Sequence, residues 1–215
     1  MRAGRPEVRV AVYDDSGRLV ELRVFPAHSY TSNFVNLLNA SWFASPGMVG
    51  QPLTPAWPLF DVLGYMYYVG YGFPGAIGQL TQWMCLRGCP NLSPYSSYTI
   101  NSPGIWAGYA QCASTINANG PCSPIPTSVL SPGPLNVPVA PLTGSPGWLF
   151  SVSQSLYNVS GATVTIASVA LVAAAYATLS GGGILYAAMV DNVNPPLSLP
   201  PNYYITVTYT IAVPS

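Results

Sequence analysis

Four cysteines are the residues of this sequence most clearly able to do chemistry. Cys85 and Cys89 stand in the segment CLRGC, and Cys112 and Cys122 stand in CASTINANGPC. Three and nine intervening residues fit the usual zinc-ligand spacings poorly, and the single histidine, His28, is far away in the sequence. We therefore predict that all four cysteines form disulfides. Local pairs and cross-links between the two segments both remain open.

Disulfides would place the chain in an oxidising exterior or in a hyperthermophilic host, where intracellular disulfides are tolerated. Three N-x-S sequons are present, at Asn39, Asn91 and Asn158. Asn39 falls on a predicted helix, so Asn91 and Asn158 are the better candidates for glycosylation on an extracytoplasmic face. The alternative is that none of the three is modified.

Catalytic chemistry has few side chains to use. Asp61 and Asp191 are the only acids after Glu21, and neither stands in a recognisable motif. No serine has a G-x-S-x-G context, and the glycine-rich segments GYGFPGAIG and SGGG are not followed by the lysine of a phosphate loop. We expect no enzyme activity, no cofactor and no metal, and we expect His28 to pack between a hairpin and a helix.

The composition favours a protein that associates with other copies over one that remains a monomer. Only 6% of the residues are charged, all basic residues are arginines, and the net charge is zero. A typical soluble domain has about 25% charged residues. The many aromatic and β-branched residues exclude a disordered chain, while zero net charge excludes a broad basic surface for nucleic acid and gives copies little mutual repulsion.

The elements begin with a β-hairpin and a helix. Apolar and polar residues alternate in VRVAVYDDSGRLVELRVF, with DDSG as the turn, so one face of the hairpin is expected to be buried and the other wet. The next segment, SYTSNFVNLLNASWF, has helical spacing and can be capped by Ser29 or Thr31. No apolar segment precedes Asp14, so we expect no export signal.

Residues 46–147 are dense in Pro, Gly, Ser, Asn and Tyr and predict long packed loops with short strands. Residues 45–150 contain only two charges but many large aromatic residues, a composition typical of interface cores. We expect the middle to form contacts between subunits, the alternative being that its aromatic residues pack under their own loops. The candidate anchors are Trp57, Tyr67, Tyr68, Tyr71, Trp83 and Trp106.

The C-terminal third contains an uncharged run from Val159 to Val190 that is long enough to resemble a membrane span. ATVTI alternates with a period of two, and SGGG at residues 180–183 divides the run into pieces of strand length. We predict two packed strands, with a membrane segment at 162–190 as the alternative.

Four segments carry a resemblance to a known family: VRVAVYDDSGRLVELRV, HSYTSNFVNLL, YNVSGATVTIASVALVA and LPPNYYITVTYTI. They resemble virion proteins of phages and archaeal viruses, notably thermophilic ones. The resemblance covers the first 40 and the last 65 residues and does not extend to the middle. It implies a β-sandwich or jelly-roll subunit, used in shells, turrets, tails or fibres, and it carries over no functional residues.

We therefore expect a mainly β, jelly-roll-like single domain with one short N-terminal helix and long Pro/Gly/Tyr-rich loops. Its parts are the hairpin and helix at 1–45, the loop-rich insertion at 46–147 and the C-terminal strands at 148–215. The expected function is a self-assembling structural subunit of a virus particle, whose partners are copies of itself and other virion proteins. The alternative is a subunit of a cellular extracellular filament or surface layer assembled by strand donation.

Overall fold

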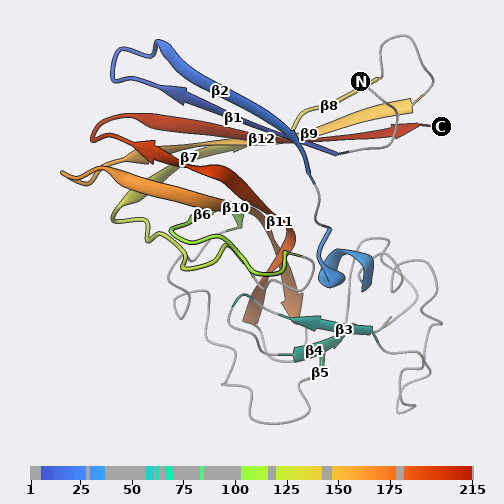
Figure 1. The fold of residues 1–215 in the computed structure, drawn as a ribbon. Coiled ribbons are helices and arrows are strands. Elements are labelled where there is room, and N and C mark those ends of the chain that lie inside the picture. The colour runs from blue at the N-terminus through green and yellow to red at the C-terminus, as the bar shows by residue number, and fades with distance from the viewer. Residues whose placement is uncertain are drawn as a thin grey trace.

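The described part of the chain is mainly β, with two antiparallel sheets packed face to face and a third, small sheet beside them (Figure 1). The computed structural model describes residues 6–27, 30–36, 57–60, 62, 66–69, 83–84, 103–115, 120–141, 147–177 and 182–214. The strands are β1 Glu7–Tyr13, β2 Leu19–Pro26, β3 Trp57–Phe60, β4 Met66–Val69, β5 Trp83–Met84, β6 Gly104–Gly108, β7 Leu130–Asn136, β8 Val139–Pro141, β9 Gly147–Asn158, β10 Val164–Ala177, β11 Gly182–Leu199 and β12 Tyr204–Pro214.

The larger sheet, sheet A, has the strand order β2-β1-β12-β9-β7, and β8 also pairs with β9. Sheet B has the order β11-β10-β6, and the small sheet has the order β3-β4-β5. β1 pairs with β12 along its whole length, so the N-terminal hairpin and the C-terminal strands belong to one sheet. The short strands predicted for the middle of the chain include β6, which joins sheet B, and β7 and β8, which join sheet A.

The core lies between sheets A and B. Val8, Val10 and Val12 point into it from β1, because the alternating residues of a strand share one face. Ile205, Val207 and Tyr209 follow from β12, and sheet B contributes residues such as Ile166, Val169, Leu197 and Leu199. Each fully buried Val, Ile or Leu side chain stabilises the fold by about 1.5–3 kcal/mol, so this cluster holds the two sheets together.

Strands β9 to β12 form one long hairpin that folds over in the middle. β10 pairs with β11 in sheet B, whereas β9 pairs with β12 in sheet A. The chain therefore passes from one sheet to the other twice, between β9 and β10 and again between β11 and β12, and both crossings lie at the same end of the sandwich (Figure 1).

The first hairpin is confirmed, but in its second strand, β2, the side that faces water is the apolar one. Phe25, Arg23 and Glu21 are the register partners of Val8, Val10 and Val12, so they share the inward face. Val20, Leu22 and Val24 are consequently exposed. The physical reason is position: β2 is the last strand of sheet A, and there Arg23 bonds to Glu21 and donates to the backbone carbonyl of Pro195 on β11.

The predicted helix is seen at residues 32–36, and the rest of its predicted length lies outside the described residues. Thr31 caps it, because its hydroxyl oxygen accepts a hydrogen bond from the Phe34 N–H at 3.4 Å. The same hydroxyl donates to the Ala187 carbonyl at 2.6 Å, which fastens the helix to β11. Ser29 and His28 lie outside the described residues.

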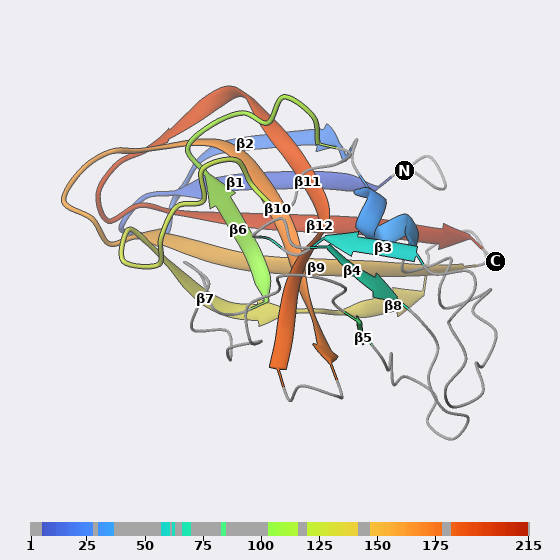
Figure 2. The ribbon, with the colours of Figure 1, turned by 90° about the horizontal axis from the view of Figure 1, so that it is seen from below.

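The uncharged run of residues 159–190 forms strands β10 and β11, joined across residues 178–181, so the prediction of two strands is confirmed. Within the described ranges, no helix is long and apolar enough to cross a membrane. Figure 2 shows β6, β10 and β11 from below, crossing under the strands of sheet A.

Candidate functional site

A disulfide-closed loop covers the outer face of sheet B. After β6 the chain turns back on itself: Tyr109 N–H donates to the Ser123 carbonyl at 2.9 Å, and Ile125 N–H donates to the Ala107 carbonyl at 2.9 Å. Cys112 and Cys122 then form a disulfide across this turn. We call residues 109–123 the disulfide loop, of which 116–119 lie outside the description.

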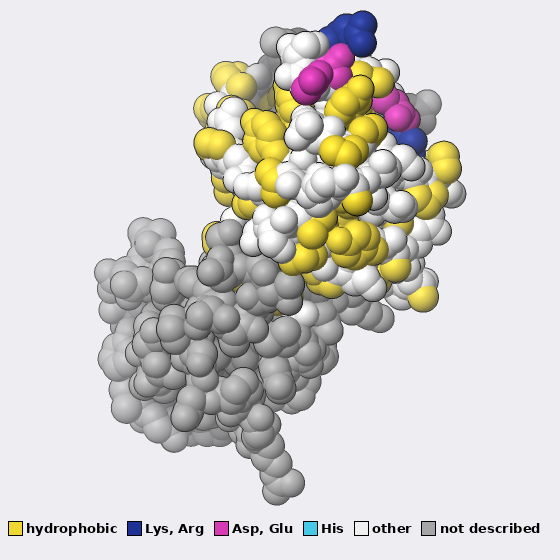
Figure 3. All heavy atoms as spheres, turned by 90° about the vertical axis from the view of Figure 1, so that its left-hand side faces the viewer, with side chains coloured by type: hydrophobic (Ala, Val, Ile, Leu, Met, Phe, Trp, Pro, Cys, Tyr) yellow, Lys and Arg dark blue, Asp and Glu magenta, His cyan; other side chains and the backbone are white. Residues whose placement is uncertain are grey.

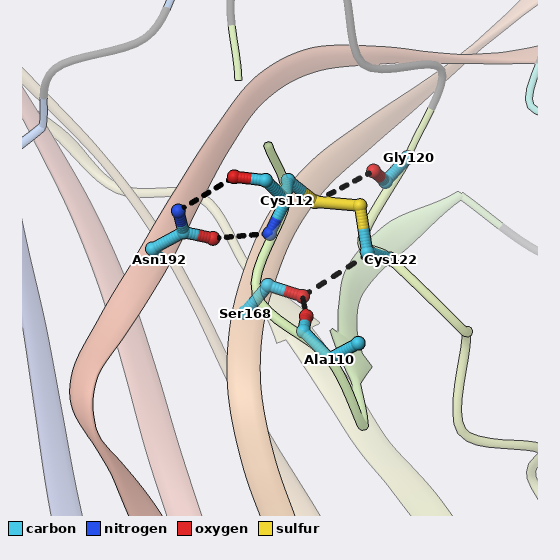
Figure 4. Close-up of a disulfide and its surroundings, with 6 residues drawn as sticks. All are labelled: Ala110, Cys112, Gly120, Cys122, Ser168 and Asn192. Carbon is cyan, nitrogen blue, oxygen red and sulfur yellow. Dashed lines mark hydrogen bonds between the residues drawn. A yellow bond between two sulfur atoms is a disulfide. The ribbon is translucent and has the colours of Figure 1, made fainter. Parts of the chain in front are cut away.

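Polar side chains of sheet B hold this loop in place (Figure 4). The Asn192 Oδ1 atom accepts from Cys112 N–H at 2.8 Å, and its Nδ2 atom donates to the Cys112 carbonyl at 2.9 Å. Ser168 donates its hydroxyl to the Ala110 carbonyl at 2.8 Å and accepts from Cys122 N–H at 3.2 Å. Two side chains thus satisfy four backbone groups of the loop. These hydrogen bonds hold the loop against sheet B, as backbone hydrogen bonds hold a neighbouring strand.

Gly108 makes this close approach possible. It is the register partner of Ser168, which in turn is the register partner of Asn192. A Cβ atom at Gly108 would lie 2.3 Å from the Cys122 carbonyl oxygen and 2.6 Å from the Ser168 hydroxyl oxygen. Only a residue without a side chain fits here, because the backbone of the disulfide loop passes directly over this position.

The disulfide loop also buries a second apolar cluster. Cys112, Trp106 and Leu185 belong to it, together with Ala170, Val172, Ala187 and Val190. The part of sheet B that carries this cluster is therefore buried on both faces, whereas Thr165 and Ser198, nearer the crossings, are exposed. The disulfide prediction is confirmed for Cys112 and Cys122 as a local pair, while Cys85 and Cys89 lie outside the described residues.

Asn158 has a structural role in place of the predicted glycan. Only 1% of the residue is exposed, and its Nδ2 atom lies 2.9 Å from each of the Ala162, Leu199 and Pro200 carbonyl oxygens. Its Oδ1 atom accepts from Ser160 N–H and from the Ser160 hydroxyl. A glycan at this nitrogen does not fit the folded chain, because the side chain is buried where both crossings of the long hairpin meet. Asn39 and Asn91 lie outside the described residues.

Asp191 lies in the core and not in an open site. It is 3% exposed, and its carboxyl neighbours the hydroxyl of fully buried Tyr209, which also donates to the Val169 carbonyl at 3.2 Å. Burial, together with the charge of Asp191, raises the pKa of Tyr209 well above its ordinary value. Asp61 lies outside the described residues.

The aromatic anchors fall into two groups. Trp106 is 4% exposed and packs in the cluster under the disulfide loop, so it is a core residue and not an interface anchor. Backbone register makes Trp57 and Trp83 the two partners of Val69 in the small sheet, with Tyr67 and Tyr68 on the strand between them. Their side chains and the whole of Tyr71 lie outside the description.

The outer face of sheet A is open and largely uncharged. Tyr13, Tyr204 and Tyr157 form a row across β1, β12 and β9, with ring centroids 4.9 Å and 5.1 Å apart. Next to this row, serine and threonine residues of β9 and β12 lie opposite one another. Two of them, Ser155 and Thr206, are hydrogen-bonded at 2.9 Å. A strand-to-strand row of this kind stabilises the sheet.

An exposed apolar strip on β2 was missed from the sequence. Leu19, Val20, Leu22 and Val24 are between 43% and 54% exposed. Figure 3, which views the described part from the end of the β1–β2 turn, shows charged side chains gathered at the upper rim and hydrophobic or uncharged polar groups over the rest. The sequence does not show that β2 is an edge strand of sheet A, and for this reason it did not predict that the apolar side of β2 faces water.

In the described part of the chain, no three His, Cys, Asp or Glu side chains gather in a way that could hold a metal ion. Comparison with protein-family models, curated proteins and solved structures found no match to the chain. The open surface of sheet A and the disulfide loop are therefore the features from which a function must be argued.

Proposed function

We propose that this chain is a structural subunit that assembles with copies of itself, and with other virion proteins, into a virus particle. The observation that carries the self-assembly is the exposed apolar strip on β2, in a chain with zero net charge. Contiguous exposed apolar surface marks contact sites, and low net charge removes the repulsion between copies. The assignment to a virion rests on the resemblance of the two ends of the sequence to virion proteins.

We further propose that the sandwich is of the jelly-roll type that such proteins use. The folded-over hairpin of β9 to β12 supports this, because each half of the hairpin lies in a different sheet. The pairing of β1 with β12 also supports it, since strands from the two ends of the described chain are neighbours in one sheet.

The second candidate function is a subunit of a cellular extracellular filament or surface layer assembled by strand addition. The observation in its favour is that β2 ends sheet A, so one edge of this strand can accept a strand from a neighbour. The disulfide between Cys112 and Cys122 suits either location.

Electron microscopy of the purified chain and of native material separates these functions. Closed shells, or particles carrying the chain at regular positions, support the virion subunit. Filaments or flat arrays attached to cells support the alternative. A folded chain that remains monomeric at high concentration, and is absent from particles, overturns both.

A further inference from the structure

The free edge of β2 offers a specific set of backbone groups. Ala27 N–H donates to the Pro6 carbonyl at 2.8 Å, and from the pair Glu7–Pro26 to the pair Val12–Glu21 the register joins residues whose numbers sum to 33. Because hydrogen-bonded and non-hydrogen-bonded pairs alternate in antiparallel sheets, Glu21, Arg23 and Phe25 direct their backbone groups toward β1. Leu22 and Val24 direct theirs outward, to the edge that no described strand pairs with, and Val20 lies at the register shift that follows Glu21.

A second copy can pair with this edge in few registers. Outward backbone groups sit only on even-numbered residues, so in an antiparallel pair of two β2 strands the residue numbers must sum to an even value. A sum of 42 places Glu21 opposite Glu21 of the second copy, and a sum of 46 places Arg23 opposite Arg23. Both juxtapose like charges, which destabilise a cross-strand pair.

The register with a sum of 44 is complementary. It places Glu21 of each copy opposite Arg23 of the other copy, and Val20 opposite Val24. Leu22 lies on the twofold axis, opposite Leu22 of the second copy. The two apolar strips then join on the outer face, while the charged side chains alternate in sign on the inner side. Glu21 and Arg23 already lie 2.6 Å apart within one copy, so the charges are in position before the copies meet.

We propose that two copies of this chain pair antiparallel through β2, centred on Leu22, to make sheet A continuous across a symmetric dimer. The inference deepens the proposed function by naming the first contact of assembly. It applies equally to a filament subunit, because it depends only on the edge strand and its charges.

Charge reversal tests both the contact and its register. Glu21→Arg gives a strand with Arg at 21 and 23, and Arg23→Glu gives one with Glu at both positions. We expect the wild type to sediment as a dimer and each variant alone to dimerise at least tenfold more weakly. An equimolar mixture should form a heterodimer, because each Arg then meets a Glu.

Folding is followed separately by thermal unfolding of each variant, and Arg9→Glu, an exposed change on the neighbouring strand β1, is the matched control that should still dimerise. A folded wild-type chain that stays monomeric, or variants that dimerise alone as well as the mixture does, overturns the proposal. If particles form from wild type and from Glu21→Arg alike, the β2 contact is wrong while the proposed function stands. If β2 dimers form but particles never do, the contact stands and the proposed function falls.

Discussion

The Asn158 amide nitrogen lies 2.9 Å from the Leu199 carbonyl oxygen, and this bond joins the two places where the long hairpin passes between sheets. Asn158 ends β9 and Leu199 ends β11, so the bond connects strands of different sheets. The backbone repeats the connection, because Asn158 N–H donates to the Tyr203 carbonyl and Asn202 N–H donates to the Asn158 carbonyl.

Asn158→Ala should lower the free energy of unfolding by about 2–3 kcal/mol, because buried carbonyl groups lose their donor. Asn158→Asp should be at least as damaging, since a carboxylate cannot donate to Leu199 and Pro200. Chemical denaturation measures both. Asn136→Ala, at an exposed position of the same sheet, is the control and should change stability by less than about 0.5 kcal/mol. Equal losses at Asn158 and Asn136 would contradict the role given to Asn158.

Asn158 should also remain unmodified when the chain is made in a host that glycosylates sequons. Its amide nitrogen lies 2.9 Å from each of three carbonyl oxygens in the folded chain, which leave no room for a sugar. Mass spectrometry of the corresponding peptide, before and after glycan removal, gives the answer. A folded product with full occupancy at this residue would show that the buried arrangement is incorrect.

Removing the disulfide by Cys112→Ser with Cys122→Ser should destabilise the chain by about 2–3 kcal/mol, in line with the short loop it closes. Asn192→Ala should cost about 1–2 kcal/mol, because it removes both bonds to the Cys112 backbone. The disulfide and Asn192 hold the same loop, so the combined variant should lose less than the sum of the two effects. Strict additivity in this double-mutant cycle would argue against a shared role.

Gly108→Ala should destabilise the chain by about 2–4 kcal/mol, because the added Cβ overlaps the Cys122 carbonyl oxygen and the Ser168 hydroxyl. Gly161→Ala is the matched control, since nothing lies within 4 Å of the Cβ position there. Thermal unfolding of the two variants side by side should show a lowered midpoint only for Gly108→Ala. Equal midpoints would mean that the loop does not lie against β6.

Stability should fall steeply in alkali. Burial raises the pKa of Tyr186 to about 12, and burial with Asp191 raises that of Tyr209 well above its usual 10.0. Between pH 10 and 12 the Tyr186 side chain is ionised in the unfolded chain but largely protonated in the folded one. The folded state then binds more protons, so the free energy of unfolding decreases as pH rises, by about 1.4 kcal/mol per pH unit from Tyr186, and the raised pKa of Tyr209 acts in the same direction.

Denaturation at successive pH values across this window measures the slope. Tyr186→Phe removes this group but keeps the buried ring, so the decrease should become less steep by about 1.4 kcal/mol per pH unit. An unchanged slope in Tyr186→Phe would show that this side chain is not buried as described.

The sequence predicted those parts of the fold that local alternation encodes. Val8, Val10 and Val12 alternate with polar residues, and ITVTYTI alternates likewise, so β1 and β12 were visible. The segment LSPGPLN was not, because Pro132 and Pro134 suggest a loop; as strand β7 it lies at the edge of sheet A, where proline is tolerated. Residues 159–190 lack charged side chains because much of β10 is buried on both faces of sheet B, which leaves few positions for polar residues.

The candidate sites were harder to predict, because tertiary position decides them. Asn158 carries a sequon in the sequence, but its burial follows from the two crossings that surround it. Val20, Leu22 and Val24 look like core residues until β2 is known to be an edge strand. Asn192 and Ser168 belong to no motif, and only the register that places them beside Gly108 reveals their function.

The central position of β12 in sheet A has a consequence for biosynthesis. β12 lies between β1 and β9, so β2 is the only described strand that can pair with β1 until residues 204–214 have left the ribosome. The other described strands of sheet A are translated earlier, and the sheet stays in two parts until β12 joins them. A transcript cut short before β12, or a ribosome stalled there, therefore yields a chain whose first hairpin is unanchored. Incomplete copies would be excluded from any assembly that requires a continuous sheet A.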